Sequence, residues 1–180
     1  METRKARTIA AACTLALCGA ALAQAAAADP AQDAREPASS MALVVFEGVP
    51  GSEALLRGDY ESGLQQSLEA AERSPGRHAF ELASNICVAQ LKLGELEAAR
   101  EHCGEVIERT VDRREGVVMA QRFKAVALVN HGVLLSAQGD VQAASLQFEE
   151  ARRKFPELAV AGSNLQLVGS APRVTVGDDL

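Results

Sequence analysis

The segment Gly139-Asp140-Val141-Gln142-Ala143-Ala144 decides the fold, because the chain contains two further versions of it. These are Gly94-Glu95-Leu96-Glu97-Ala98-Ala99 and Gly58-Asp59-Tyr60-Glu61-Ser62-Gly63. Each begins with glycine and an acidic residue, continues with an apolar residue and ends with a small one. Two of the helix-length stretches that follow end at a proline, Pro75 or Pro156. Such recurrence indicates a helical repeat architecture, which typically builds concave binding surfaces.

Apolar residues spaced three and four apart predict a helix on each side of these turns. We expect helices over about residues 52–57 and 60–73, 77–93 and 95–110, 122–137 and 140–154, and a shorter amphipathic one over 158–168. The turn glycines lie 36 residues apart from Gly58 to Gly94, but 45 residues apart from Gly94 to Gly139. An insertion over residues 111–122 is therefore expected, which either lengthens a helix or adds a turn.

Residues 1–23 have the layout of a secretory signal peptide. A basic start is followed by an uncharged apolar stretch and then by small residues that place the cleavage site between Ala23 and Gln24. The stretch is too short and too rich in alanine for a membrane span. We therefore expect a periplasmic or secreted protein with no integral span after signal removal. Leu17 argues against a lipoprotein anchor at Cys18, since a small residue belongs before such a cysteine.

The expected mature chain is acidic. Signal removal takes three of the 18 basic and one of the 24 acidic residues, which leaves 15 and 23 and a net charge of −8. This charge argues against nucleic acid and anionic membranes as partners. Tryptophan is missing and tyrosine occurs once, which also argues against a base-stacking surface.

The chain after the signal divides by composition into four parts. Residues 24–40 are small and polar and predict a flexible lead-in. Residues 41–51 begin with the apolar, β-branched run Met41-Ala42-Leu43-Val44-Val45-Phe46 and predict an extended arm or single strand. Residues 52–168 form the helical repeat domain, and residues 169–180 are expected to be a flexible tail.

Two of the three units resemble tetratricopeptide repeats along their whole length. In both, a segment in the place of the family's Asn-Leu-Gly and a turn glycine stand at the family's spacing: Asn130-His131-Gly132 with Gly139, Ala144, Phe148, Ala151 and Pro156, and Asn85-Ile86-Cys87 with Gly94, Ala99 and Cys103. The first unit matches only in its second half, because Pro50 and Gly51 truncate its first helix. The pattern is also similar to small exported repeat proteins of proteobacteria. The resemblance implies an all-α, right-handed stack of about three helical hairpins, the first degenerate, with a C-terminal capping helix.

The resemblance further implies that the first helix of each hairpin lines a concave groove. On that register the groove residues are mostly apolar: Val88, Leu91, Val126, Val129 and Val133. The Lys, Arg and Asn side chains that would hold a peptide's terminal carboxylate are expected to be missing from this face. An exposed apolar strip usually marks a binding site. The alternative is that the chain covers the strip itself, with residues 43–46 or with the insertion.

Cys87 and Cys103 are the two cysteines of the expected mature chain. Cys87 is expected late in the helix before the Gly94 turn and Cys103 mid-way along the helix after it. Antiparallel helices bring these positions close together, and both face the partner helix, so a disulfide could join them. The alternative is a pair of small buried thiols that fill a tight contact. Export favours the disulfide.

No catalytic, metal or cofactor site is expected. His78, His102 and His131 share no metal-ligand spacing, and the sequence lacks the common hydrolase, zinc, phosphate-loop and dinucleotide motifs. We therefore expect a non-catalytic periplasmic module that binds a protein or peptide. The alternatives are a self-assembling structural or envelope-associated protein, in which copies associate, and a thiol-redox protein.

Overall fold

The computed structural model describes residues 41–109 and 116–170, and these residues fold into seven helices without a β-strand. The expectation of an all-α protein is thereby confirmed for this part of the chain. The signal segment, the lead-in, residues 110–115 and residues 171–180 lie outside the described residues, as do Cys18, Ala23 and Gln24. The helices are α2 (Ser52–Leu56), α3 (Tyr60–Arg73), α4 (Ala79–Leu93), α5 (Leu96–Arg109), α6 (Val117–Ala137), α7 (Val141–Lys154) and α8 (Ala159–Ser170).

The repeated glycine–acid segments form the turns within the helix pairs. Gly94 and Gly139 have φ angles of 77° and 87°, a left-handed conformation in which glycine has no side-chain penalty. Asp59 and Asp140 cap the next helix, with carboxylate oxygens accepting from the backbone N–H of Ser62 at 3.2 Å and of Ala143 at 2.9 Å. The same local chemistry therefore starts α3 and α7.

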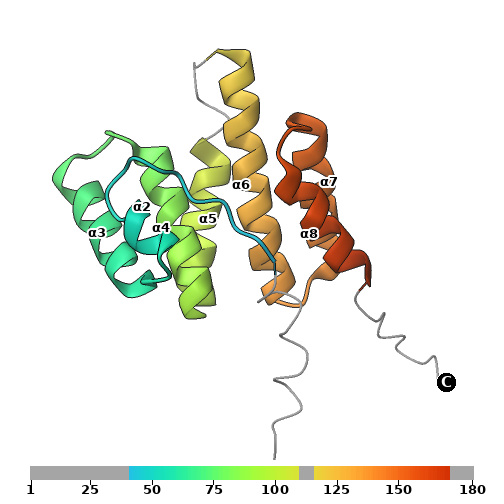
Figure 1. The fold of residues 1–180 in the computed structure, drawn as a ribbon, viewed down its shortest axis with the longest axis horizontal. Helices are drawn as coiled ribbons and strands as arrows, with labels where there is room; N and C mark the ends of the chain where they lie inside the picture. The colour runs from blue at the N-terminus through green and yellow to red at the C-terminus, as the bar shows by residue number, and fades with distance from the viewer. Residues whose placement is uncertain (1–40, 110–115, 171–180) are drawn as a thin grey trace, which may run out of the picture.

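Each helix packs against the helix before it and the helix after it in the chain. In addition α2 contacts α4, α4 contacts α6, and α6 contacts α8, so these four helices form a row. Figure 1 shows the elements following one another across the molecule, from α2 and α3 at one side to α7 and α8 at the other. Small residues allow the close approach within pairs: Ala99 and Ala144 are fully buried, and Gly132 contacts the ring of Phe148.

The predicted insertion lengthens a helix at least in part. The helix expected to begin near residue 122 begins at Val117 and runs for 21 residues. Its first three residues expose apolar side chains, with Val117 at 74%, Val118 at 66% and Met119 at 43% exposure. The expected terminal helix is present as α8, which begins at Ala159 and ends at Ser170.

Candidate functional site

The most distinctive site is formed where residues 41–46, here called the arm, lie across the row of helices. The arm has no helical or strand structure. Figure 1 shows it as a thin blue segment that crosses from the side of α8 over α6 to α4 before the chain enters α2. It runs over the three helices in the reverse of their order in the chain. The arm is therefore held by elements that follow it at large sequence separations.

Among the described residues, three asparagines hold the arm by its main chain, one from each helix beneath it. We call Asn85, Asn130 and Asn164 the asparagine ladder. Each side-chain amide accepts from the N–H and donates to the C=O of a single arm residue. Asn164 binds Ala42 at 2.9 and 2.8 Å, Asn130 binds Val44 at 2.9 and 3.0 Å, and Asn85 binds Phe46 at 2.8 and 2.9 Å.

The alternation of the bound residues follows from the geometry of an extended chain. In such a chain the N–H and C=O of one residue point to the same side, and every second residue repeats that direction. A carboxamide carries one acceptor and two donors in a plane, so it can pair with both groups as a neighbouring strand would. The ladder thus recognises extended main chain at a two-residue interval.

The ladder is rigid because it is buried. Asn85 and Asn164 are fully buried, and Asn130 is 2% exposed. The Asn130 amide also donates to Ser84 Oγ at 3.2 Å, which joins α6 to α4 beneath the arm. A buried polar group without a partner costs about 1–3 kcal/mol, so an empty ladder would be less stable than an occupied one unless water replaced the arm.

The arm's side chains provide a second set of contacts, at both of its ends. Met41 is 2% exposed and packs with Val133, Ala144, Phe148 and Val168. Phe46 packs with Phe80 and Phe123, with ring centroids 5.4 Å from each, and those two rings are 4.9 Å apart. Centroid distances of this size are favourable for aromatic pairs. In the middle of the arm Val44 packs on the cluster of Ala125, Leu128, Val129, Ala151 and Ala161.

The residues predicted to line a groove lie inside the protein. Val88, Val126, Val129 and Val133 are at most 3% exposed, and Leu91 is half-buried. Val129 belongs to the cluster against which Val44 packs, and Val133 contacts the cluster that contains Met41. Of the two interpretations left open by the sequence, the structure shows the one in which residues of the arm cover this face.

One sequence-based expectation about the face is wrong. Asparagine was expected to be missing from it, whereas the ladder is its central polar feature. The misreading arose because Asn85 and Asn130 were taken only as marks of a repeat, and Asn164 lies in the segment that matches the repeat least. A usable signal did exist: Asn85 and Asn130 both stand nine residues before a turn glycine, and Asn164 follows Asn130 by 34 residues.

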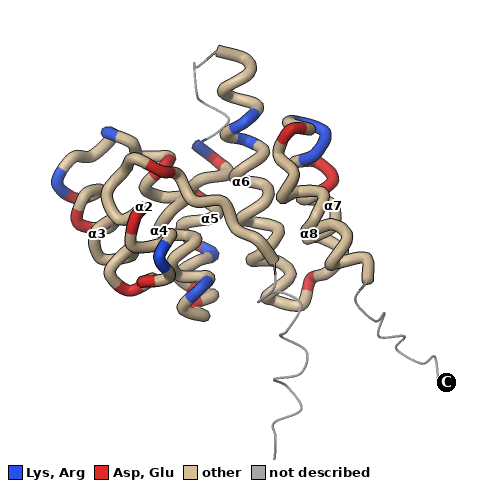
Figure 2. The backbone as a smooth tube through the Cα atoms, viewed as in Figure 1, with Lys and Arg blue, Asp and Glu red and all other residues tan. Residues whose placement is uncertain are grey.

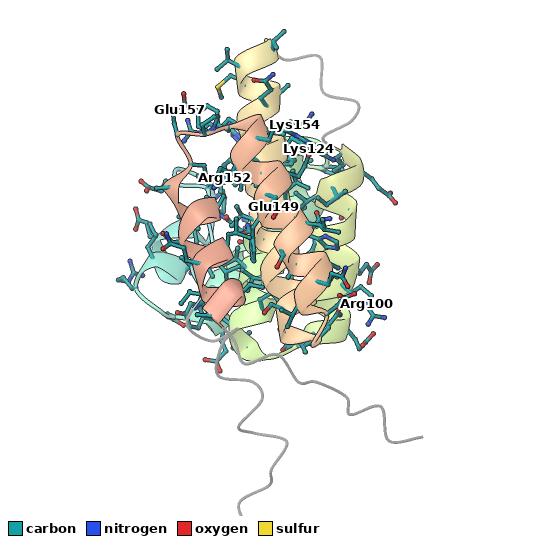
Figure 3. All side chains as sticks on the ribbon, turned by 90° about the vertical axis from the view of Figure 1, so that its right-hand side faces the viewer. Arg100, Lys124, Glu149, Arg152, Lys154 and Glu157 are labelled. Carbon is teal, nitrogen blue, oxygen red and sulfur yellow. A yellow bond between two sulfur atoms is a disulfide. The ribbon has the colours of Figure 1, made fainter. Side chains whose placement is uncertain are left out.

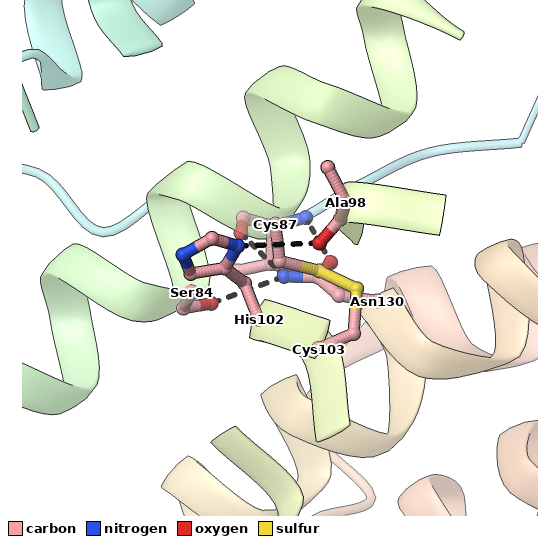
Figure 4. The surroundings of a disulfide bond; sticks show 7 residues. Ser84, Cys87, Ala98, His102, Cys103 and Asn130 are labelled. Atoms are coloured by element: carbon pink, nitrogen blue, oxygen red, sulfur yellow. Dashed lines mark hydrogen bonds between the residues drawn. A yellow bond between two sulfur atoms is a disulfide. The ribbon is translucent and has the colours of Figure 1, made fainter. Parts of the chain in front are cut away.

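Cys87 and Cys103 form a disulfide that joins α4 to α5, with a Cα–Cα distance of 5.2 Å. Both residues are buried, at 1% and 2% exposure. Figure 4 shows that the disulfide lies close to Ser84 and Asn130, beneath the middle of the ladder. His102, next to Cys103 in the chain, donates from Nδ1 to the Ala98 carbonyl oxygen at 3.2 Å. The bond therefore fixes the helix pair that carries Ser84 and Asn85.

The ionisable groups do not converge on the arm. Residues 41–46 carry no charge, and Figure 2 shows the arm crossing the helices as an uncharged segment. Figure 3 shows Lys124 and Lys154 at the same end of α6 and α7. Burial and the nearby Lys154 lower the pKa of Lys124. His131 also has a lowered pKa, chiefly through burial, although a hydrogen bond to Gln147 opposes the shift. Within residues 41–109 and 116–170, no group of three or more His, Cys, Asp or Glu side chains could hold a metal ion.

Comparisons with protein-family models, with curated proteins and with solved structures give no match to this chain. In the part of the chain that the structure describes, none of the helices combines the length and apolar character needed to cross a membrane.

Proposed function

We propose that this protein is a non-catalytic interaction module that binds an extended segment of a protein or peptide along the α4–α6–α8 row. The observation that carries the proposal is the asparagine ladder, which holds main-chain N–H and C=O groups at three alternate residues. Recognition of an extended backbone with pockets for chosen side chains is a general mode of peptide binding. In the free protein the arm occupies this site and imitates the ligand.

We further propose that the scaffold is a stack of tetratricopeptide-like repeats: about three right-handed hairpins, the first degenerate, with α8 as the capping helix. The equal sequence spacing of one contact in three helix pairs supports this proposal. A tight contact joins residues 16 positions apart in each of three helix pairs: Gly51 with Ser67, Cys87 with Cys103, and Gly132 with Phe148. A contact repeated at one register is expected of a solenoid, in which each unit packs on its neighbours in the same way.

We place the protein in the periplasm or outside the cell. The signal-like residues 1–23 and the Cys87–Cys103 disulfide support export, because disulfides persist in oxidising compartments. Fractionation of the producing cells and N-terminal sequencing test the assignment. A cytoplasmic chain that retains Met1 would contradict it.

A structural role is the second candidate. The near-complete burial of Met41 and the packing of Phe46 against the rings of Phe80 and Phe123 favour it, since they make the arm part of the core. In that case the ladder serves only to fix the chain's own N-terminal segment. The two candidates differ in whether the ladder accepts a second peptide.

A labelled peptide with the sequence of residues 40–47 separates the candidates by fluorescence anisotropy. A tethered arm competes at an effective concentration on the order of 1 mM, so the unmodified full chain should bind the peptide weakly. Phe46→Ala in the chain weakens the resident arm and should raise the apparent affinity at least tenfold. Adding Asn130→Leu should abolish binding, whereas Gln121→Leu, which alters an exposed amide of the same helix, should not.

Circular dichroism must first show that the variants keep their helices. Failure of the folded Phe46→Ala chain to bind the peptide would exclude the open-groove function and support the structural one. A peptide in which aspartate replaces the phenylalanine is the matched ligand control, and it should not bind.

A further inference from the structure

Glu47 and Gly48 separate the arm from the rest of the described chain, here called the body. Both residues are exposed, Gly48 has a φ of 77°, and a side chain built on it would contact nothing within 4 Å. The chain becomes anchored directly after it. Ser52 Oγ donates to the Val49 carbonyl at 2.7 Å, and Ser67 Oγ donates to the Pro50 carbonyl at 3.1 Å. Gly48 is therefore a free pivot between two held segments.

The arm is attached to the body as a separate element. Its six bonds to the ladder join main chain to side chains that lie 39, 86 and 122 residues further along the chain. None of these bonds depends on which copy of the chain supplies the arm. A rotation at Gly48 would release the whole arm without disturbing the anchored residues that follow it.

We propose that two copies of this chain exchange arms at high concentration, so that the arm of each copy binds the asparagine ladder of the other. The exchange goes beyond peptide recognition, since it makes the ladder an interface between copies. It keeps every arm contact described above and changes only the turn at Gly48. Exchange of an identical element between protomers is a low-cost route to a symmetric dimer.

A second copy is the occupant favoured by the contacts themselves. The segment shown to fit the ladder is the arm, with Met41 in its cluster and Phe46 packed against Phe80 and Phe123. Every copy carries both this segment and its site, so the two are matched in register and in side chains. At low concentration the arm stays bound to the ladder of its own chain. The tether gives the arm an effective concentration on the order of 1 mM, so it outcompetes the arm of another copy.

The hinge offers a direct test. Gly48→Pro forbids the positive φ of the turn, a Cβ at residue 48 meets no atom within 4 Å, and the residue before the proline remains compatible with an extended arm. We expect the full Gly48→Pro chain to double its mass in sedimentation or light scattering. Gly48→Asn is the matched control, because asparagine tolerates the left-handed conformation, and it should stay monomeric at the low concentration at which Gly48→Pro is already a dimer. Adding Phe46→Asp to Gly48→Pro should abolish the dimer.

Mixing two variants provides a second test that keeps the native hinge. The Phe46→Asp chain has a damaged arm and an intact ladder, whereas the Asn130→Leu chain has an intact arm and a damaged ladder. Only exchange places an intact arm on an intact ladder, so a 1:1 complex should form in the mixture and in neither variant alone. This measurement decides the matter if Gly48→Pro does not fold.

The remaining outcomes are equally decisive. A Gly48→Pro chain that stays monomeric would overturn arm exchange, and its binding of the free peptide would leave the proposed function standing. A dimer that persists with Phe46→Asp uses another surface and also overturns the exchange. A dimer that forms through the arm although the free peptide never binds would support the exchange and exclude the open groove.

Discussion

The α4–α5 and α6–α7 pairs build the same contact in two chemically different ways. Counted from the turn glycine, Cys87 and Cys103 occupy the positions that Gly132 and Phe148 occupy in the next pair. In α4–α5 a covalent bond crosses the contact. In α6–α7 the ring of Phe148 fills it, and a Cβ at residue 132 would lie only 2.6 Å from Cε1 of that ring. The helix separation at this point is thus preserved by a bond in one case and by complementary volume in the other.

The α2–α3 pair adds a third solution at the same register. There Gly51 faces Ser67, and a Cβ on Gly51 would lie 2.4 Å from the Gly63 carbonyl oxygen. Backbone meets backbone, with no large side chain between. The comparison teaches that the scaffold specifies a distance between paired helices and leaves the chemistry that maintains it to each pair.

Removal of the disulfide should have the largest effect. We expect Cys87→Ala with Cys103→Ala to lower the free energy of unfolding by about 3 kcal/mol, the chain-entropy value for a closed loop of about 16 residues. Chemical denaturation with and without reductant measures it. The double variant should no longer respond to reductant. Two reactive thiols in denatured, unreduced exported protein would contradict the bond.

The glycine–aromatic contact should be the next most sensitive. Gly132→Ala overlaps the fully buried Phe148 and should cost about 1–3 kcal/mol by overpacking. Gly104→Ala is the matched control, since it is also in a helix but has open space around it and should stabilise by about 0.5–1 kcal/mol. Adding Phe148→Leu to Gly132→Ala should recover part of the loss in a double-mutant cycle. Strict additivity would show that the two residues do not share a contact.

Substitutions in the turns should change the stability of the α4–α5 and α6–α7 pairs by nearly equal amounts. Gly94→Ala and Gly139→Ala both place an alanine at a positive φ without a steric overlap, so each should cost about 1–2 kcal/mol. Thermal unfolding of the two variants should give closely similar losses. A much larger loss in one of them would show that its turn does more than reverse the chain.

The pH dependence should give the smallest difference. His131 stands where α4 has Ile86, and burial lowers its pKa below the ordinary value of 6.5. The unfolded chain therefore binds the proton first, and stability falls as the pH drops from about 6.5 through the lowered pKa of the folded state. His131→Leu should remove this part of the acid dependence in urea titrations. Parallel stability–pH curves for the two proteins would contradict the assignment.

The helices and their turns could be predicted from the sequence because their signals are local. Gly94 and Gly139 mark left-handed turns, and Asp59 and Asp140 mark helix starts, each within a few residues of the structure they specify. The Cys87–Cys103 pair could also be anticipated, because one short turn separates the two helices. The start of α6 was placed too late, although Gly116 stands at its N-cap, because glycine offers no side-chain capping group and marks a helix start only weakly.

The site could be predicted only in part, because its contacts connect distant segments. The arm's apolar run predicts an extended segment, but a two-residue period does not say which surface will cover it. The 122 residues between Ala42 and Asn164 carry no local signal that the two meet. Repeat register placed Val129 and Val133 on the face against which the arm packs. The ladder was missed because asparagine in a helix has several ordinary roles.

The interval between the rungs of the ladder also has a mechanical consequence. Two residues of extended chain advance about 6.6–6.8 Å, whereas the axes of packed helices lie about 8–10 Å apart. A row of helices can match the shorter step only if its asparagines converge towards the arm. The arm then spans the concave side of the row of helices. Its length between Ala42 and Phe46 limits how far α4, α6 and α8 can spread apart on that side.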